Sequence, residues 1–406
     1  MKTDIVVIGG GASGIAAALE IKKQRPDTDV VIAERLDRIG KKILATGNGR
    51  CNLTNRDLSA GFYHGSVKNM NEIIHNTEDS VDFFRSLGVL CTADEEGRVY
   101  PYSKSAASVL NALRLKLASY GVREECGFYV TGIEKNKGGY IVISEDGRRI
   151  FTKKIIVSCG GYASPVNGTD GNAIKLFRQM GYRTEKICPA VAPLRTSPEA
   201  LKGLKGVRTH GKVSALSSGK VISCQTGEIQ FTENSLSGIC VFNLAYLFSV
   251  YEGNMELEID FLPELAEDEV RKLFMQIKNA RAEHTIEDFL SGVFVKNLSL
   301  YITKRFVPHP FTDKISSITE KEISKLAQAV KSVRYTVTGC SSWQNAQATA
   351  GGISGSCVDE QLCSKKDSGI YFAGEILDVD GECGGYNLEW AWSSGKWAGK
   401  YCALSL

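Results

Sequence analysis

The sequence has little that would take it outside the ordinary globular proteins. It contains 9 prolines and no low-complexity tract, a composition typical of a soluble globular chain. No apolar run approaches the ~18 uninterrupted residues of a membrane-spanning helix, so we expect no membrane span. No run of Lys and Arg stands out, and a formal charge of +3 is too small to favour a nucleic-acid partner.

The cysteines and histidines also lack a metal-binding or redox pattern. The 12 cysteines include no CxxC pair and show no metal-ligand spacing with the 5 histidines, so we expect no bound metal. A glutathione-reductase-like disulfide mechanism needs a second cysteine four or five residues from Cys51, and none is present there. Unpaired thiols, and an N-terminal apolar segment that Asp4 interrupts, predict a cytoplasmic protein without a secretion signal.

What is present begins with residues 4–14, DIVVIGGGASG, which join an apolar strand to an alanine-rich helix through a glycine turn. Gly9 permits the tight turn, Gly11 lets a pyrophosphate approach the backbone, and Gly14 lets the helix pack closely on the strand. The start of the helix offers free N–H groups and the positive end of its dipole to phosphates. The stretch therefore predicts a phosphate-binding turn.

Glu34 supports this interpretation. It ends a second apolar run, 30–33, and lies 20 residues after Gly14, where an acidic residue accepts hydrogen bonds from an adenosine ribose. A strand–turn–helix whose glycines serve only packing would not require an acid at this position. The spacing predicts a dinucleotide-binding domain.

The loop 40–55 follows and is rich in glycine, amide and basic side chains. It resembles a flexible surface loop in composition, but three cations and several asparagines beside a phosphate site favour a functional one. We expect Lys42 and Arg50, with Lys41, to offset pyrophosphate charge. Asn48 and Asn52 are expected to hydrogen-bond the polar edge of a flavin ring.

The nucleotide-binding pattern returns near the C-terminus. Residues 369–375 form an apolar strand that ends in glycine and Glu375, and Asp378 follows before a helix that begins near Asn387. The carboxylates are expected to orient ribitol hydroxyls, and the dipole of the helix is expected to face the flavin. A glycine-bounded strand at each end of the chain implies a discontinuous domain.

The predicted fold class is α/β, with a discontinuous Rossmann-type FAD-binding domain and an inserted region made of a mixed β lobe and a helical lobe. Residues 1–188 form the first part of the FAD domain, with a helical excursion at about 66–121, and 339–406 form the second part. The inserted region is 189–338, with the β lobe at about 190–260 and the helical lobe at about 264–331. We expect it to shape a substrate pocket.

Four motifs make the chain resemble a known family along nearly its whole length: GGGASG at 9–14, KKILATGNGRCNLTN at 41–55, ATAGGIS at 348–354, and YFAGEILDVDGECGGYNLEWAWSSGKWAG at 371–399. The sequence is similar to the bacterial flavoproteins called YhiN-like, BaiN-type or aminoacetone-oxidase-type. The resemblance implies non-covalent FAD. It also implies the following FAD contacts: Gly9, Gly11, Ala12, Ser13, Gly14, Glu34, Lys42, Asn48, Arg50, Asn52, Val130, Gly160, Gly374, Glu375, Asp378, Asn387 and Leu388. The chain departs from the family at 357–364, where it has Cys357, Leu362 and Cys363.

The resemblance implies an oxidoreductase with a small-molecule substrate. BaiN-type members imply reduction of a C=C bond conjugated to a ketone in bile-acid or steroid-like compounds, with electrons from transiently bound NAD(P)H. Two alternatives remain open: an aminoacetone-type amine oxidase that produces peroxide, and a flavin-containing protein that modifies or binds RNA. The flavin performs the hydride chemistry, so a catalytic residue is not identified. Candidate proton donors are Arg50, Cys51, Tyr162 and Tyr386.

Overall fold

The computed structural model describes residues 1–251 and 253–406. These fall into two compact units: unit 1 comprises Met1–Ala190 and Trp343–Leu406, and unit 2 comprises Val191–Ser342. The predicted boundaries lie at 188/189 and 338/339. The predicted α/β class with a discontinuous Rossmann-type unit is confirmed.

The elements of unit 1 are, in chain order, β1 (Lys2–Ile8), α1 (Ala12–Gln24), β2 (Val30–Ala33), α2 (Lys41–Ala45), β3 (Thr54–Asn55), β4 (Tyr63–Gly65), α3 (Met70–Asn76), α4 (Ser80–Ser86), β5 (Cys91–Ala93), β6 (Arg98–Pro101), α5 (Ala106–Ser119), β7 (Arg123–Glu125), β8 (Val130–Asn136), β9 (Gly139–Ser144), β10 (Arg149–Val157), α6 (Asn172–Gln179), β11 (Cys188–Ala190), β19 (Ala348–Ala350), β20 (Ile370–Phe372), β21 (Val379–Gly381) and α12 (Tyr386–Leu404). Those of unit 2 are β12 (Leu194–Arg195), β13 (Arg208–Ser217), β14 (Lys220–Phe231), β15 (Ser235–Ser237), α7 (Ile239–Phe242), α8 (Leu247–Val250), β16 (Met255–Asp260), α9 (Glu267–Ala280), α10 (Lys296–Phe306), α11 (Glu320–Val330), β17 (Val333–Val337) and β18 (Gly339–Cys340).

Unit 1 is built on a parallel sheet in which β1 lies between β2 and β10. Ile8, at the end of β1, is level with Ala33 of β2 and Val157 of β10. β20 pairs in parallel with the C-terminal half of β10, while the hairpin β8–β9 pairs with its N-terminal half. The last four residues of β1, 5–8, and the whole of β2 are apolar and buried, because both faces of a parallel sheet are covered. Their carboxyl ends meet at one edge, which positions the site described below.

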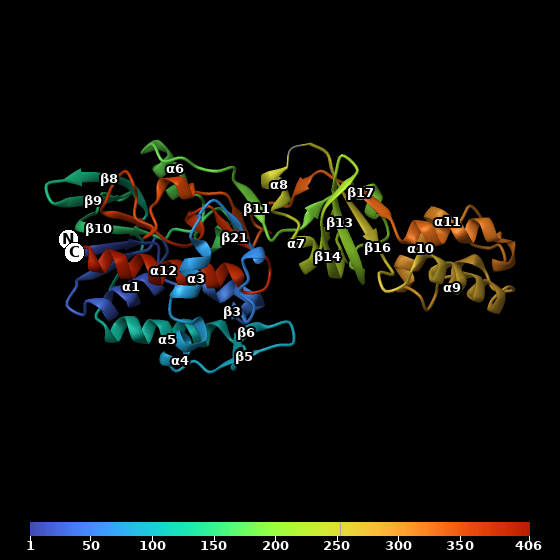
Figure 1. Cartoon of the computed structure of the whole chain (residues 1–406), viewed down its shortest axis with the longest axis horizontal. Helices are drawn as coiled ribbons and strands as arrows, with labels where there is room; N and C mark the ends of the chain where they lie inside the picture. The colour runs from blue at the N-terminus through green and yellow to red at the C-terminus, as the bar shows by residue number, and fades with distance from the viewer. Residues whose placement is uncertain (252) are drawn as a thin grey trace. The chain divides into compact units, whose positions relative to one another are not determined.

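The first and last helices of the chain lie side by side (Figure 1), because small residues let their backbones approach. A Cβ at Gly395 of α12 would lie 2.3 Å from the carbonyl oxygen of Ser13, and one at Gly399 would lie 2.6 Å from that of Ala17. Only glycine fits at these two places on α12. The contact joins the two separated stretches of unit 1 into one core.

The predicted helical excursion at 66–121 contains a hairpin that the sequence analysis did not anticipate. Helices α3, α4 and α5 occupy half of it, and β5 and β6 pair between α4 and α5. The turn is closed by Asp94, whose carboxylate accepts hydrogen bonds from the backbone and the guanidinium of Arg98. Gly97 takes the left-handed conformation, with φ +77°. This local turn chemistry overrides the helical pattern on either side.

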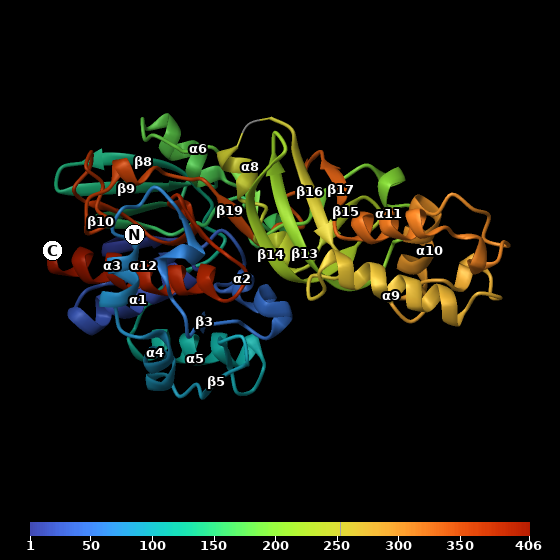
Figure 2. The same cartoon turned by 45° about the vertical axis from the view of Figure 1, so that its right-hand side comes forward.

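Unit 2 consists of an antiparallel sheet followed by helices, as Figure 2 shows. The strands are ordered β17-β16-β13-β14-β15-β12-β18, and β16 alternates buried and half-buried residues. Helices α9 and α11 pack against each other through residues such as Phe274 and Leu326, which are fully buried. No helix among the described residues has the length and apolarity needed to cross a membrane.

Candidate cofactor and active site

A cleft in unit 1 opens at the carboxyl edge of the parallel sheet. Its walls come from the turn after β1, the ends of β2 and β10, helix α2, the start of β8, the loop before α6 and the first turns of α12. Of the predicted FAD contacts, the following line it: Gly9, Gly11, Ala12, Ser13, Glu34, Lys42, Val130, Gly160, Glu375, Asn387 and Leu388. Those outside the lining are Gly14, Asn48, Arg50, Asn52, Gly374 and Asp378.

The three glycines of the turn have different surroundings. Gly9 has φ +101°, and a Cβ there would lie 2.6 Å from the carbonyl oxygen of Ser158. A Cβ at Gly14 would lie 2.0 Å from the carbonyl oxygen of Gly9. At Gly11, in contrast, a Cβ would meet no protein atom within 4 Å, and no side chain caps the start of α1. The open space beside uncapped N–H groups fits a phosphate.

Glu34 is held rigidly at the wall of the cleft. One carboxylate oxygen accepts a hydrogen bond of 2.8 Å from the Gly10 amide, and the other accepts one of 2.9 Å from the Leu36 amide. The side chain is buried, and each oxygen keeps a further lone pair for a hydroxyl donor. These two acceptor oxygens fit the hydroxyl groups of an adenosine ribose.

A polar cluster that the sequence analysis missed lies in the same wall. Arg35 stacks on the ring of Tyr129 at 4.9 Å and forms an ion pair of 2.6 Å with Asp170. Asp170 also accepts a hydrogen bond of 3.0 Å from the Tyr129 hydroxyl. Burial alone would raise the pKa of Asp170, but the backbone of Asn172 and the charge of Arg35 lower it overall. In the sequence, the feature that pointed to this cluster is the position of Arg35 directly after Glu34.

Lys42 and Glu375 meet in the cleft although 333 residues separate them in the chain. The Lys42 ammonium donates to one oxygen of Glu375 at 2.7 Å, and the Thr349 amide donates to the other at 2.7 Å. In turn, the Thr349 hydroxyl accepts hydrogen bonds from the amides of Tyr162 and Ala163. The charge of Lys42 is thus met by a carboxylate within the protein as well as being available to a phosphate.

Asn52 carries a polar atom without a partner. Its side-chain oxygen is buried and accepts no hydrogen bond from the described residues. It lies close to the start of α12, since a Cβ at Gly385 would approach it to 3.0 Å. A buried unsatisfied acceptor is costly, so a donor is required. The Asn52 oxygen does not line the cleft, and the features that fit FAD there are the open space at Gly11 and the two acceptor oxygens of Glu34.

Asp378 and Asp380, the two acids that follow Glu375 in the sequence, have partners outside the cleft lining. Asp380 lies on β21 opposite His64 of β4, with 3.3 Å between its carboxylate and the ring. Asp378 accepts a side-chain hydrogen bond from Ser66. Burial raises the pKa of both carboxyl groups. Of these acids, Glu375 is the one that the structure brings to the cleft.

None of the four candidate proton donors lines the cleft. Cys51 is fully buried, and burial raises the pKa of its thiol to about 12, so it stays protonated at neutral pH. Tyr386 stacks on Phe62 at 4.6 Å, and burial raises the pKa of its hydroxyl to about 12. The Tyr162 ring lies against Gly171, where a Cβ would approach it to 2.0 Å, and Arg50 is exposed.

Asn387 acts on the backbone of the turn before α12. Its side chain accepts a hydrogen bond of 3.0 Å from the Gly381 amide and donates one of 2.6 Å to the Gly381 carbonyl. The turn at 381–385 is therefore fixed, and the uncapped start of α12 faces the cleft beside Leu388. A helix N-terminus in this position stabilises negative charge on a bound ring.

The chain matches the sequence profile described as "HI0933-like protein Rossmann domain" over residues 3–401. It is 38% identical over 410 residues to the 3-dehydro-bile acid delta(4,6)-reductase of Clostridium scindens, covering 98% of both chains. It is 25% identical over 412 residues to the ribosomal RNA dihydrouridine synthase of Haemophilus influenzae, covering 99% of this chain and 98% of that one. The same name belongs to an Escherichia coli relative that is 24% identical.

Two solved structures share the fold. FrdA of the Escherichia coli quinol fumarate reductase aligns with a TM-score of 0.52 and 14% identity, covering 100% of this chain and 70% of that one. The 3-ketosteroid delta1-dehydrogenase of Sterolibacterium denitrificans aligns with a TM-score of 0.51 and 12% identity, covering 100% of both. The family predicted from the four sequence motifs is confirmed. The chain belongs to the HI0933-like Rossmann family, and it is an FAD-dependent oxidoreductase.

Proposed function

We propose that this protein reduces a C=C bond conjugated to a ketone in a 3-oxo bile-acid or steroid-like substrate, with electrons that NAD(P)H delivers transiently. The observation that carries the proposal is the 38% identity to the 3-dehydro-bile acid delta(4,6)-reductase over 98% of both chains. The substrate is a small molecule, and the reaction takes place in a reducing cytoplasm.

The more distant relatives support the same reaction type. Dihydrouridine is uridine whose C5=C6 bond has been reduced, and that bond is conjugated to a carbonyl group. Both kinds of relative are thus named for the reduction of a C=C bond activated by a carbonyl. The shared chemistry is hydride transfer to the carbon β to the carbonyl, with a proton added at the α-carbon.

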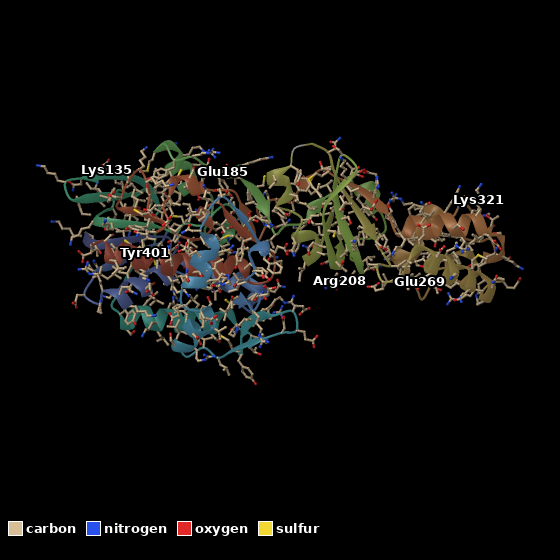
Figure 3. The ribbon with its side chains drawn as sticks, viewed as in Figure 1. Lys135, Glu185, Arg208, Glu269, Lys321 and Tyr401 are labelled. Atoms are coloured by element: carbon tan, nitrogen blue, oxygen red, sulfur yellow. The ribbon has the colours of Figure 1, made fainter. Side chains whose placement is uncertain are left out.

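The balance of basic and acidic residues gives little support to the alternative that this protein binds or modifies RNA. Unit 2 contains 18 Lys and Arg against 17 Asp and Glu, and the remaining excess over the whole chain is also small. Figure 3 shows both signs on neighbouring helices, with Glu269 on α9 and Lys321 on α11, and Arg208 on the sheet. A protein that grips an RNA backbone carries a basic surface. We therefore favour the small substrate.

When bound, FAD accepts and donates the hydride. The chain's residues hold it: the amides at 11–13 bind the pyrophosphate, Glu34 binds the ribose, and the backbone at Val130 lies against the adenine. Glu375, fixed by Lys42, orients the ribityl chain, and Asn52 accepts from the ring. Gly9, Gly14, Gly160 and Gly374 give the backbone its close approach, and Asn48, Arg50, Asp378, Asn387 and Leu388 complete the predicted set.

The direction of the reaction follows from the relative and not from the thiols. Steady peroxide production damages accessible thiolates, which argues for a reductase in a chain with 12 cysteines. However, burial raises the pKa of Cys51 and Cys159 to about 12, so these thiols are poor targets of peroxide. The identity to the named reductase, and not the thiols, therefore favours the reductase over the amine oxidase.

The test is an anaerobic stopped-flow experiment on the FAD-loaded protein. NADH or NADPH should bleach the flavin, and a 3-oxo-Δ4 bile acid should reoxidise it faster than dissolved oxygen does. Reduction of the flavin by aminoacetone, with oxygen as the faster acceptor, would establish the amine oxidase instead. Reoxidation by a uridine-containing ribosomal RNA fragment, and not by the enone, would establish the RNA reaction.

A further inference from the structure

An exposed pair of cations shares one aromatic ring beside the cofactor cleft. The Arg50 guanidinium lies 5.1 Å from the centre of the Tyr100 ring, and the Lys104 ammonium lies 4.8 Å from it. Tyr100 itself is buried, whereas both cations are exposed. We call these three residues the Tyr100 cluster.

Neither cation of the cluster has an acidic partner. Among the described residues, no carboxylate lies within 4.0 Å of Arg50 or Lys104. The nearby acids Asp94 and Glu96 are both paired with Arg98. Each cation gains from the face of the ring, and no carboxylate of the described residues balances its charge. An anion from outside the chain would balance it.

The backbone holds the cluster in strained conformations. Asn48 and Cys51, on either side of Arg50, have φ +55° and +60°, and Lys104 itself has φ +51°. Left-handed backbone is unfavourable for residues other than glycine and tends to gather at ligand-binding positions. The Arg50 amide donates to the Gly47 carbonyl, and the Lys104 amide donates to the Pro101 carbonyl. Both cations are thus placed by fixed turns.

The cluster adjoins the cleft. Thr46 lines the cleft, and the next residue, Gly47, lies against the Tyr100 ring, to which a Cβ would approach within 3.5 Å. A Cβ at Gly47 would also lie 2.8 Å from the Asn52 amide, next to the unsatisfied Asn52 side chain.

We propose that Arg50 and Lys104 form an oxyanion-binding site for a reactant of the enzyme. The shared chemistry is a carboxylate or phosphate oxygen that accepts charge-assisted hydrogen bonds from both cations. The oxyanion has two sources: the carboxylate of an acidic enone substrate, or a phosphate of NAD(P)H. The choice between these sources rests on the proposed function, whereas the site itself does not.

The first experiment measures binding of inorganic pyrophosphate to the FAD-loaded protein by equilibrium dialysis, which needs no turnover. Lys104→Gln and Arg50→Gln should each weaken binding by on the order of tenfold, the loss expected for one charge-assisted contact. Lys104→Glu should weaken it further, because it supplies Arg50 with an internal partner. The matched control is Lys116→Gln, a lone lysine 4.3 Å from the Tyr120 ring, which should change nothing. Equal binding by the parent and all variants overturns the site.

The second experiment identifies the source. The apparent Kd of NADPH and NADH in anaerobic flavin reduction is compared with the KM of a 3-oxo-Δ4 bile acid and of its methyl ester. If Lys104→Gln weakens only the nicotinamides, the site takes phosphate. If it raises KM for the acid and not for the ester, the site takes the carboxylate. Unchanged values for both reactants overturn the proposal, whereas absence of enone turnover with intact pyrophosphate binding refutes only the proposed function.

Discussion

The two units of this molecule use their residues in different ways. In unit 1 the turn at the cleft follows the needs of a ligand: Gly11 has φ −81°, which any residue adopts, yet it is a glycine and faces open space. In unit 2 the strands follow packing, and β17 alternates buried and exposed residues. Features that make no sense for folding alone therefore mark the functional part of the molecule, and regular patterns mark the part whose sequence serves stability.

The largest expected effect separates ligand from fold within unit 1. Gly11→Val should abolish FAD binding, because its side chain fills the space beside the uncapped start of α1, while the protein still folds. The φ of Gly11 is −81°, which valine adopts, and its Cβ would meet no protein atom within 4 Å. Flavin absorbance relative to protein, together with circular dichroism, measures the two properties. A folded Gly11→Val protein with full FAD content would contradict the assignment.

The matched control for that prediction is Gly14→Val. A Cβ at Gly14 would lie 2.0 Å from the Gly9 carbonyl oxygen, so this variant should fail to fold or lose much of its thermal stability. The two variants are thus expected to fail in different ways: Gly11→Val folds but lacks FAD, whereas Gly14→Val fails to fold or loses much of its thermal stability. If both variants behave alike, the distinction between a ligand-facing and a packing glycine is wrong.

A core change in unit 2 should leave the flavin untouched. Phe274 is fully buried on α9 and packs on Phe289 with ring centres 6.1 Å apart. Phe274→Ala should lower the free energy of unfolding of unit 2 by about 3–5 kcal/mol, because it removes contacts and leaves a cavity. Scanning calorimetry measures the loss and flavin absorbance the FAD content. Phe274→Leu should cost less, and loss of FAD in either variant would show that the units depend on each other.

A smaller effect is expected at the ion pair that the sequence analysis missed. Asp170→Asn removes the 2.6 Å pair with Arg35 at the wall of the cleft. Because both side chains are partly exposed, the loss should speed FAD release only up to about fivefold. Stopped-flow fluorescence of released FAD measures it. Asp146→Asn, which breaks the exposed 2.7 Å pair with Arg148, is the control and should leave release unchanged.

The smallest effect concerns pH. Hydrogen bonds from the backbone and hydroxyl of Thr319 lower the pKa of Glu322 from 4.5 to about 2. A carboxyl whose pKa is lower in the folded state stabilises the fold above its unfolded pKa, and this contribution is lost as pH falls from about 4.5 to about 2. Glu322→Gln should therefore cost up to about 1 kcal/mol at pH 7 and almost nothing near pH 2. Hydrogen exchange at the amides of α11 measures the difference.

In unit 1 the pKa of Asp380 is shifted upward, opposite to that of Glu322, so its contribution to stability changes with pH in the opposite direction. Burial raises the pKa of its carboxyl above 3.8, so its contribution to stability is present at low pH and is lost as pH rises through the folded pKa. Asp380→Asn should remove this dependence. If the amides of β21 and of α11 both become better protected from exchange as pH rises over this range, the opposite pH dependences expected for the two acids are wrong.

The sequence by itself determined the local elements and the family. The run 30–33 is β2 as predicted, and the alanine-rich helix predicted after the glycine turn is α1, because a buried apolar run and an alanine-rich segment have few alternatives. The glycine turn and Glu34 were identifiable because their spacing is set along a single strand–turn–helix unit. The fold class followed from the recurrence of this pattern at both ends of the chain.

Only the tertiary structure decided which distant residues meet. Lys42 and Glu375 form an ion pair across 333 residues, and Asp380 faces His64 instead of the cleft. Arg50 and Lys104 come together on Tyr100 because the unexpected hairpin β5–β6 carries the ring to the loop after α2. No local pattern encodes these contacts, since each depends on how strands are ordered in space. The sequence specified the cofactor turn, and the fold selected the charges that surround it.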